Sequence, residues 1–157
     1  MATTIDHIEL ANKNHQVLAL LLAQPEETRS SEWLTTVAFY KAVHVVEAVF
    51  ATANAHSKSH NDRLDRLRRP EYGQFFVHFS PLYCASMVAR YLVDSGPSNL
   101  GEATSVQQFH CFTDYKPASQ VISSLIMKRL NGLEQEAARR LSEENRRILM
   151  RVQNLPR

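Results

Sequence analysis

Apolar side chains recur at helical spacing along most of the chain. The first such pattern predicts a helix over residues 5–23, with one stripe expected to face the core: Ile8, Ala11, His15, Leu18 and Leu22. We expect Thr4 or Asp6 to cap the start of this helix. Two histidines lie in the segment: His7 is expected on the surface and His15 at the edge of the stripe.

A second helix is predicted to begin near Trp33, after an N-cap at Ser30 or Ser31, and to end near Asn54. Two stripes run along it. One is apolar throughout and is expected to lie in the core: Phe39, Val43, Val46 and Phe50. The other begins apolar and ends polar: Trp33, Val37, Tyr40, His44 and Glu47. Apolar residues on both sides indicate a central helix, so the polar end must find partners inside the fold, because an unpaired buried polar group costs about 1–3 kcal/mol.

A short helix is predicted from His60 to Arg69, with Ser59 as its N-cap and Pro70 beyond its end. Its only apolar residues are Leu64 and Leu67. We therefore expect it to lie on the surface with a basic outer face: Arg63, Arg66, Arg68 and Arg69.

The aromatic segment 71–79 is also expected to be helical. Ser80 and Pro81 resemble an N-cap followed by a proline in the first turn, so either a new helix begins there or one helix is kinked there. In both cases the helix continues to Leu92. Residues 94–116 show the least regular pattern, and we expect a loop with one short helix near 106–112.

Pro117 is predicted to open the last and longest helix, whose apolar periodicity continues to Val152. Gly132 weakens that helix in its middle. Its other side alternates acidic and basic residues, a pattern typical of a solvated surface: Glu134, Glu136, Arg139, Arg140, Glu143, Glu144, Arg146 and Arg147.

Composition supports a single helical domain over residues 1–157. The hydrophobic fraction is 44%, which is typical of a globular protein, and four glycines are few for a β-meander. The formal net charge of +2 excludes a strong electrostatic footprint for tight DNA binding, although a local basic patch remains open. Cys84 and Cys111 are expected to be buried thiols in a reducing compartment. The start of the chain does not resemble a signal peptide, and no apolar run approaches the roughly 20 residues of a membrane span, so we expect a cytoplasmic protein without a membrane partner.

Candidate chemistry concentrates between Trp33 and Arg63. An FYKAVHVVEA helix, an H-x3-H-x2-R turn and a later LYxxSxxARY helix occur in this order. Together they resemble the HEPN superfamily, over roughly Trp33 to Tyr91. The corresponding residues are Trp33, Phe39, Tyr40, His44, Glu47, His56, His60, Arg63, Tyr83, Ser86, Arg90 and Tyr91. The resemblance implies an up-and-down bundle of four main helices with an additional short one, often a homodimer, and RNA or nucleotide handling, commonly in toxin–antitoxin and defence systems.

One departure from that family bears on catalysis. HEPN ribonucleases share an arginine followed, after four to six residues, by a histidine. No arginine in this chain has a histidine at that spacing, and Arg90 is followed by none until His110. Metal-free ribonuclease activity therefore cannot be carried over, and members without the motif resemble binding or scaffold modules.

Three interpretations of the polar residues stay open. In a ribonuclease with a displaced active site, His44 or His56 would serve as base and acid, and Arg63 or Arg90 would hold the phosphate. In a metal site, His56 and His60 at i and i+4 would be joined by Glu47 or His44, although the cap at Ser59 places His56 before the helix. In a purely structural cluster, Tyr40, His44 and Glu47 would bond to Arg90 or Tyr83 across the helix interface.

We predict a binding module without a cofactor. It would be a homodimer, mildly supported by the aromatic residues from Tyr72 to Phe79, with RNA, a nucleotide or a protein as partner. The binding residues would be Tyr40, His44, Glu47, His56, His60, Arg63, Tyr83 and Arg90. The ribonuclease with a displaced His/Arg site (His44, His56, His60, Arg63, Arg90) and a metal-binding bundle are the alternatives.

Overall fold

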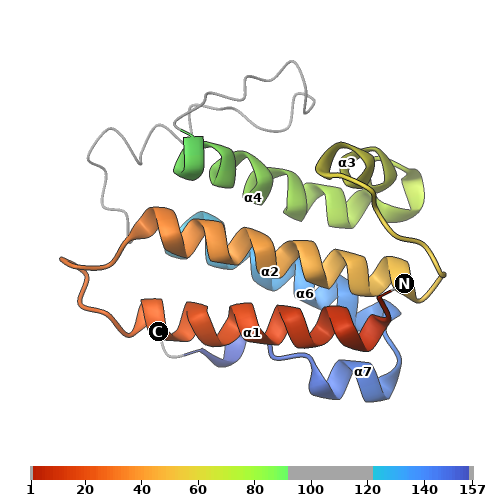
Figure 1. Ribbon diagram of the computed structural model, residues 1–157, viewed down its shortest axis with the longest axis horizontal. Helices are drawn as coiled ribbons and strands as arrows, with labels where there is room; N and C mark the ends of the chain where they lie inside the picture. Colours follow the sequence, from red (N-terminus) through yellow and green to blue (C-terminus); the bar gives the residue numbers. More distant parts are fainter. Residues whose placement is uncertain (1, 92–121, 156–157) are drawn as a thin grey trace.

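The computed structural model describes residues 2–91 and 122–155 (Figure 1). Four longer helices are present in these ranges: α1 (Thr4–Leu22), α2 (Ser31–Ala51), α4 (Gly73–Tyr91) and α6 (Lys128–Arg140). Shorter elements join them: α3 (His60–Leu67), α7 (Glu143–Ile148), the 3-10 turns η1 (Pro70–Tyr72) and η6 (Val152–Asn154), and the π-helical turn η5 (Ile122–Met127). The described ranges contain no strand, so the prediction of an all-α protein is confirmed.

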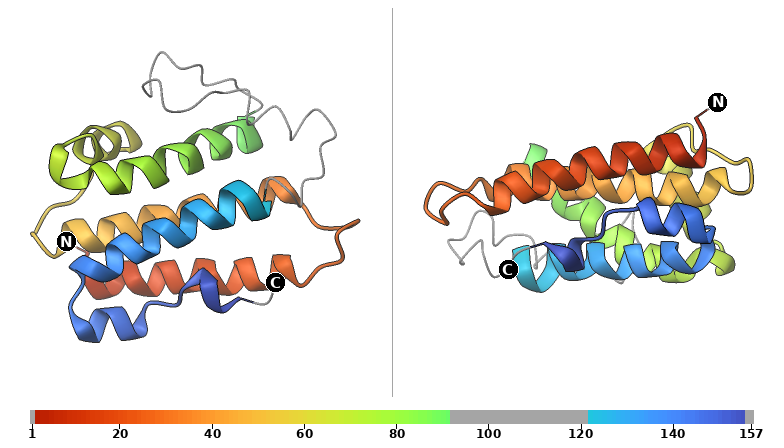
Figure 2. Two further views of the ribbon diagram at one scale, coloured as in Figure 1. Left: turned by 180° about the vertical axis from the view of Figure 1, so that it is seen from behind. Right: turned by 90° about the horizontal axis from the view of Figure 1, so that it is seen from below.

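The longer helices form a bundle in which each runs opposite to the one before it in the chain, so that α6 runs parallel to α2 (Figures 1 and 2). Helices α1, α2 and α4 lie side by side, and α6 packs behind α2 and against α4 (Figures 1 and 2). Helix α2 is the central element, because it contacts all three others. Its predicted core stripe is buried, and the prediction of a central helix is confirmed: Phe39, Val43, Val46 and Phe50.

The sequence predicts the starts of the first two helices to within a residue or two. Ser30 caps α2 by accepting a hydrogen bond from Trp33 N. Helix α1 is capped by Thr3 rather than by Thr4 or Asp6, because the Thr3 hydroxyl accepts from Asp6 N while the Asp6 carboxylate accepts from Thr3 N. Among the described helices α2 has the length and apolar composition of a membrane span, with 78% of the apolar window buried inside the bundle.

Helix α4 is one continuous helix with Pro81 inside it. Of the two alternatives, a single helix through Pro81 is therefore found, and a new helix capped by Ser80 is wrong. The helix already begins at Gly73, directly after the η1 turn. Its first half is held in place by aromatic packing, since Phe79 contacts Phe39 with ring centroids 5.6 Å apart. Most of the aromatic surplus that mildly supported a dimer thus lies within the fold.

The last predicted helix is broken, and its expected continuation to Val152 is wrong. Helix α6 ends at Arg140, and Ser142 then caps α7 by accepting a hydrogen bond from Asn145 N. The break folds the chain back along α1, where Asn12 bonds the backbone at Ile148 and Met150. Gly132 does more than weaken α6, since a side chain there would overlap the ring of His78 on α4. The predictions for residues 94–116, Pro117 and Cys111 lie outside the described residues, whereas Cys84 is buried as expected.

Candidate functional site

Glu47 is the centre of a polar cluster where α2 ends. The residue is buried, and its carboxylate accepts two hydrogen bonds, one at Oε1 from Arg63 Nε (2.8 Å) and one at Oε2 from the backbone N of Ser57 (3.1 Å). His56 Nδ1 lies 3.9 Å from Oε2. Helix α2 supplies the carboxylate, the following turn supplies the histidine, and α3 supplies the guanidinium, so the cluster ties three consecutive segments together.

His7 belongs to this cluster, and the expectation that it lies on the surface is wrong. It is only 9% exposed. Its Nδ1 lies 3.3 Å from Nδ1 of His44, and its ring centroid lies 5.5 Å from that of His56. The sequence held one signal for this burial: His7 precedes Ala11 by four residues and His15 by eight, so it continues the buried stripe of α1. His15 is also buried.

Three of these side chains offer ligand atoms to a common point. One atom each from His7, Glu47 and His56 lies within 4.8 Å of the other two, and no other such group occurs among the described residues. Nε2 of His7 is buried without a hydrogen-bond partner. The pairing of His56 with His60, which the i, i+4 spacing suggested, does not form, because α3 begins at His60 and leaves His56 in the preceding turn.

A second group adjoins the first and is built around the buried ring of Phe39. His60, Tyr83 and Tyr40 all contact that ring, with centroid distances of 5.4, 5.7 and 5.5 Å. The guanidinium of Arg90 lies 5.5 Å from the Phe39 centroid, and its NH1 donates to the Tyr40 hydroxyl at 3.2 Å. The expected bond between Arg90 and Tyr40 is therefore present.

Arg63 connects the two groups, and its expected place on a basic outer face is wrong. Its side chain is buried, with Nε on Glu47 and NH1 2.7 Å from Nδ1 of His60. The eight predicted binding residues lie in the two adjoining groups, where Phe39 and His7 supply the links between some of them: Arg90, Tyr40, Tyr83, His60, Arg63, Glu47, His56 and His44. Glu47 pairs with Arg63 and not with Arg90 across the helix interface.

The histidines are held toward their neutral forms. Burial, with the positive charges of His7 and Arg63, lowers the pKa of His44 to about 4. Burial also lowers the pKa of His7, and burial with the charges of Arg63 and Arg90 lowers the pKa of His60. With its pKa lowered, His44 is a poor proton donor near pH 7, and the Nε of Arg63 is engaged by Glu47.

A second polar site on α2 was missed by the sequence interpretation. Lys41 and Glu134 are both 0% exposed and form an ion pair between α2 and α6, so the expected solvated position of Glu134 is wrong. Lys41 Nζ also donates to the carbonyl of Met150 at 2.9 Å, and Glu134 Oε2 accepts from the backbone N of Val152 at 2.8 Å. The pair therefore holds the segment that follows α7 against the bundle.

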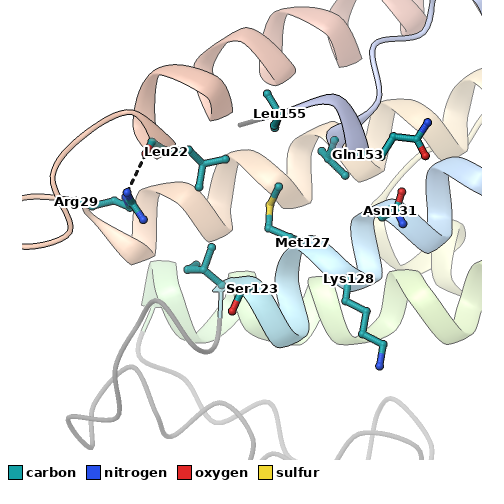
Figure 3. A pocket seen from close by; sticks show the side chains of 10 residues that line it. Leu22, Arg29, Ser123, Met127, Lys128, Asn131, Gln153 and Leu155 are labelled. Carbon is teal, nitrogen blue, oxygen red and sulfur yellow. Dashed lines mark hydrogen bonds between the residues drawn. The ribbon is translucent and has the colours of Figure 1, made fainter. Parts of the chain in front are cut away.

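The opposite end of the bundle contains a pocket of about 540 Å³ between α1, η5 and the C-terminal segment (Figure 3). Its wall is mostly apolar, with Arg29 held at the edge by the carbonyls of Leu22 and Gln24. Since fifteen residues of α1 separate His7 from Leu22, the pocket lies about 22 Å from the histidine cluster. None of the predicted site residues lines it.

The chain has no match among known proteins in the three comparisons made. No protein-family model matches it, and neither a curated protein nor a solved structure does. The HEPN resemblance of residues 33–91 thus stays a prediction, and the function has to be argued from the geometry of this helical bundle.

Proposed function

We propose that this protein is a HEPN-like binding module that recognises a nucleotide unit, free or within single-stranded RNA, on the face where α2 meets α4. The observation that carries the proposal is an exposed aromatic row on α2 with an arginine of α4 placed over its inner end. The homodimer, the cytoplasmic location and the HEPN relationship are part of the same proposal and rest on the sequence pattern.

The aromatic row consists of Trp33 and Tyr40, which are 66% and 37% exposed. They stand seven residues apart on one face of α2, about 10 Å along its axis. Large aromatic surfaces are normally buried, so two on one helix face suggest a binding function. Stacking of a base on such a ring contributes about 1–3 kcal/mol and tolerates any base, because every base has a π-face.

Arg90 adds a cation beside the rings. Its guanidinium lies 5.6 Å from the Tyr40 centroid and is oriented by the carbonyl of Ser86, to which Nε donates at 3.2 Å. A guanidinium fixed at the edge of an aromatic surface is suited to a phosphate, since its planar donors match phosphate oxygens. The combination of ring and fixed cation favours a nucleotide over a purely apolar protein segment.

The proposal assigns no catalysis to this face. A ribonuclease needs a proton donor near the scissile phosphate, and burial lowers the pKa of His44, one of the residues proposed for that role from the sequence, to about 4. The displaced-site ribonuclease is therefore kept as an outcome of the test.

The test is RNA binding by the purified protein, measured by fluorescence anisotropy with short labelled oligouridine and oligoadenosine at low and moderate salt. We expect salt-sensitive binding to both, weakened roughly tenfold by Trp33→Ala, the loss of about one stacked base. Arg90→Gln should reduce the salt dependence by about one phosphate contact. Val77→Ala is the matched control, because Val77 is exposed on α4 and its carbonyl faces Arg129 of α6.

Two results would overturn the proposal. One is the absence of RNA or nucleotide binding at low salt, which would direct attention to a protein partner for the same aromatic row. The other is cleavage of the RNA that is lost in His44→Ala or His60→Ala, which would establish the displaced-site ribonuclease instead.

A further inference from the structure

We infer that His7, Glu47 and His56 form a binding site for a divalent transition-metal ion of the zinc class, with one coordination position open to solvent. This site is separate from the aromatic face of α2 and does not depend on it. Its three ligands come from α1, α2 and the turn after α2. Such a metal would therefore tie the start of the first described helix to the far end of the second.

The geometry provides the first argument. The three ligand atoms lie within 4.8 Å of one another. Ligands bound to one zinc ion at about 2.0–2.2 Å stand roughly 3–3.5 Å apart in a tetrahedral site. Small rotations of the two imidazole rings would close the remaining difference. Two imidazole nitrogens with one carboxylate oxygen is a ligand set that leaves a fourth position for water.

The unsatisfied nitrogen of His7 provides the second argument. Its side chain is more than nine-tenths buried, and Nε2 has no hydrogen-bond partner. A buried polar atom without a partner costs free energy, so its persistence points to a ligand at that position. Nδ1 of His7 is occupied by the contact to His44, which leaves Nε2 as the nitrogen that a metal would use.

The groups around the three ligands fit an outer shell that orients them. His44 contacts the second nitrogen of His7, and Arg63 holds Oε1 of Glu47, the oxygen away from His56. Metal-binding histidines and carboxylates are generally positioned by such hydrogen bonds. Oε2 also accepts from Ser57 N, and a carboxylate oxygen has a further lone pair for a metal. The positive charge of Arg63 repels a metal ion, but Arg63 contacts Oε1 of Glu47, whereas the ion would bind Oε2.

Access to solvent comes from His56. Its side chain is 20% exposed, whereas that of Glu47 is 5% exposed, so water reaches the cluster from the turn between α2 and α3. His60 does not take part, because its Nδ1 contacts Arg63 and its ring packs on Phe39. His60, four residues after His56, is therefore a matched control for the substitutions of the metal ligands.

The experiment is titration of tag-free, EDTA-treated protein with ZnCl2 by isothermal calorimetry, with CoCl2 followed by visible absorption as a second probe. We expect one ion per chain and a rise in melting temperature on zinc addition, since a ligand of the folded state stabilises it. His7→Gln and His56→Gln should each weaken zinc binding by at least about tenfold, as even outer-shell changes cost 10–100-fold. His60→Gln should bind zinc like the wild type.

Circular dichroism of each variant checks that it is folded, and His56→Gln is the decisive variant because His56 is the most exposed of the three ligands. The inference is overturned if the wild type takes up no stoichiometric zinc or cobalt. It is also overturned if folded His7→Gln and His56→Gln bind the metal as tightly as the wild type. RNA binding enters neither measurement, so the two proposals fail independently.

Discussion

Helix α2 carries two buried charges of opposite sign, Lys41 and Glu47, and their surroundings differ. Lys41 is closed off: its ammonium meets the Glu134 carboxylate and a backbone carbonyl, and that carboxylate takes a backbone N–H in turn. Glu47 lies in a cluster whose hydrogen-bonding groups are not all satisfied: Nε2 of His7 has no partner, and the side chain of His56 reaches solvent. A saturated pair serves the fold, whereas an incompletely satisfied cluster near solvent is a candidate site.

The largest loss in the free energy of unfolding is expected at the closed pair, Lys41 and Glu134. Lys41→Met would leave the Glu134 carboxylate buried without its counter-charge, and breaking one partner of such a pair costs about 3–5 kcal/mol. Urea unfolding should show this loss, and Lys128→Met on the exposed side of α6 is the matched control. Adding Glu134→Leu to Lys41→Met should recover part of the loss, because both buried charges are then gone. A cost below about 1 kcal/mol for Lys41→Met would show that the pair does not hold the C-terminal segment to the bundle.

A smaller effect is expected at the open cluster in the absence of metal. Glu47→Gln removes the charge that faces Arg63 but keeps an oxygen for one hydrogen bond, so we expect a loss of about 2–3 kcal/mol in EDTA. Glu143→Gln is the control, since its pair with Arg147 on α7 is exposed and should contribute less than about 1 kcal/mol. If Glu47→Gln proved as costly as Lys41→Met, the contrast between a closed pair and an open cluster would fail.

The contrast also explains what could be predicted from sequence. The central helix, its apolar stripe and the polar ridge ending at Glu47 follow from periodicity, which reports local geometry directly. The partners of that polar ridge cannot be predicted from periodicity. Arg63 was expected on a basic surface because Leu64 and Leu67 are the only apolar residues of its helix, and only the turn after α2 brings it back onto Glu47. His7 lies forty residues before Glu47, and no local pattern links them.

The C-terminal segment shows a second limit of sequence interpretation. Alternating charge from Glu134 onward is typical of a solvated helix, yet Glu134 is fully buried because it faces Lys41 on another helix. The break after Arg140 did carry a signal, since Ser142 with polar residues after it is a helix start. The apolar periodicity continues past this helix start, so the sequence predicted one long helix. Long-range pairing and chain reversal are tertiary properties, which a single helical pattern does not encode.

The smallest of the three expected changes in stability depends on pH and comes from His15, beside the closed pair. Burial, together with the positive charge of Lys41, lowers the pKa of His15 to about 4, against about 6.5 in the unfolded chain. Between these values the unfolded state binds more protons, so the free energy of unfolding falls as the pH drops from about 6.5 toward 4 and is independent of His15 above about 7.

His15→Leu cannot titrate, and it should therefore lose less stability than the wild type between pH 7.5 and pH 5. We expect the difference to be on the order of 1–2 kcal/mol, measured by urea unfolding at both pH values. Lys41 and Glu134 face the same region, so the comparison is repeated in the double variant Lys41→Met with Glu134→Leu. Removing the Lys41 charge should shrink the effect of His15 but not abolish it, because burial is the larger cause of the lowered pKa. An unchanged pH dependence in His15→Leu would mean that His15 is hydrated in the folded protein, and the region around Lys41 would then not be closed to water.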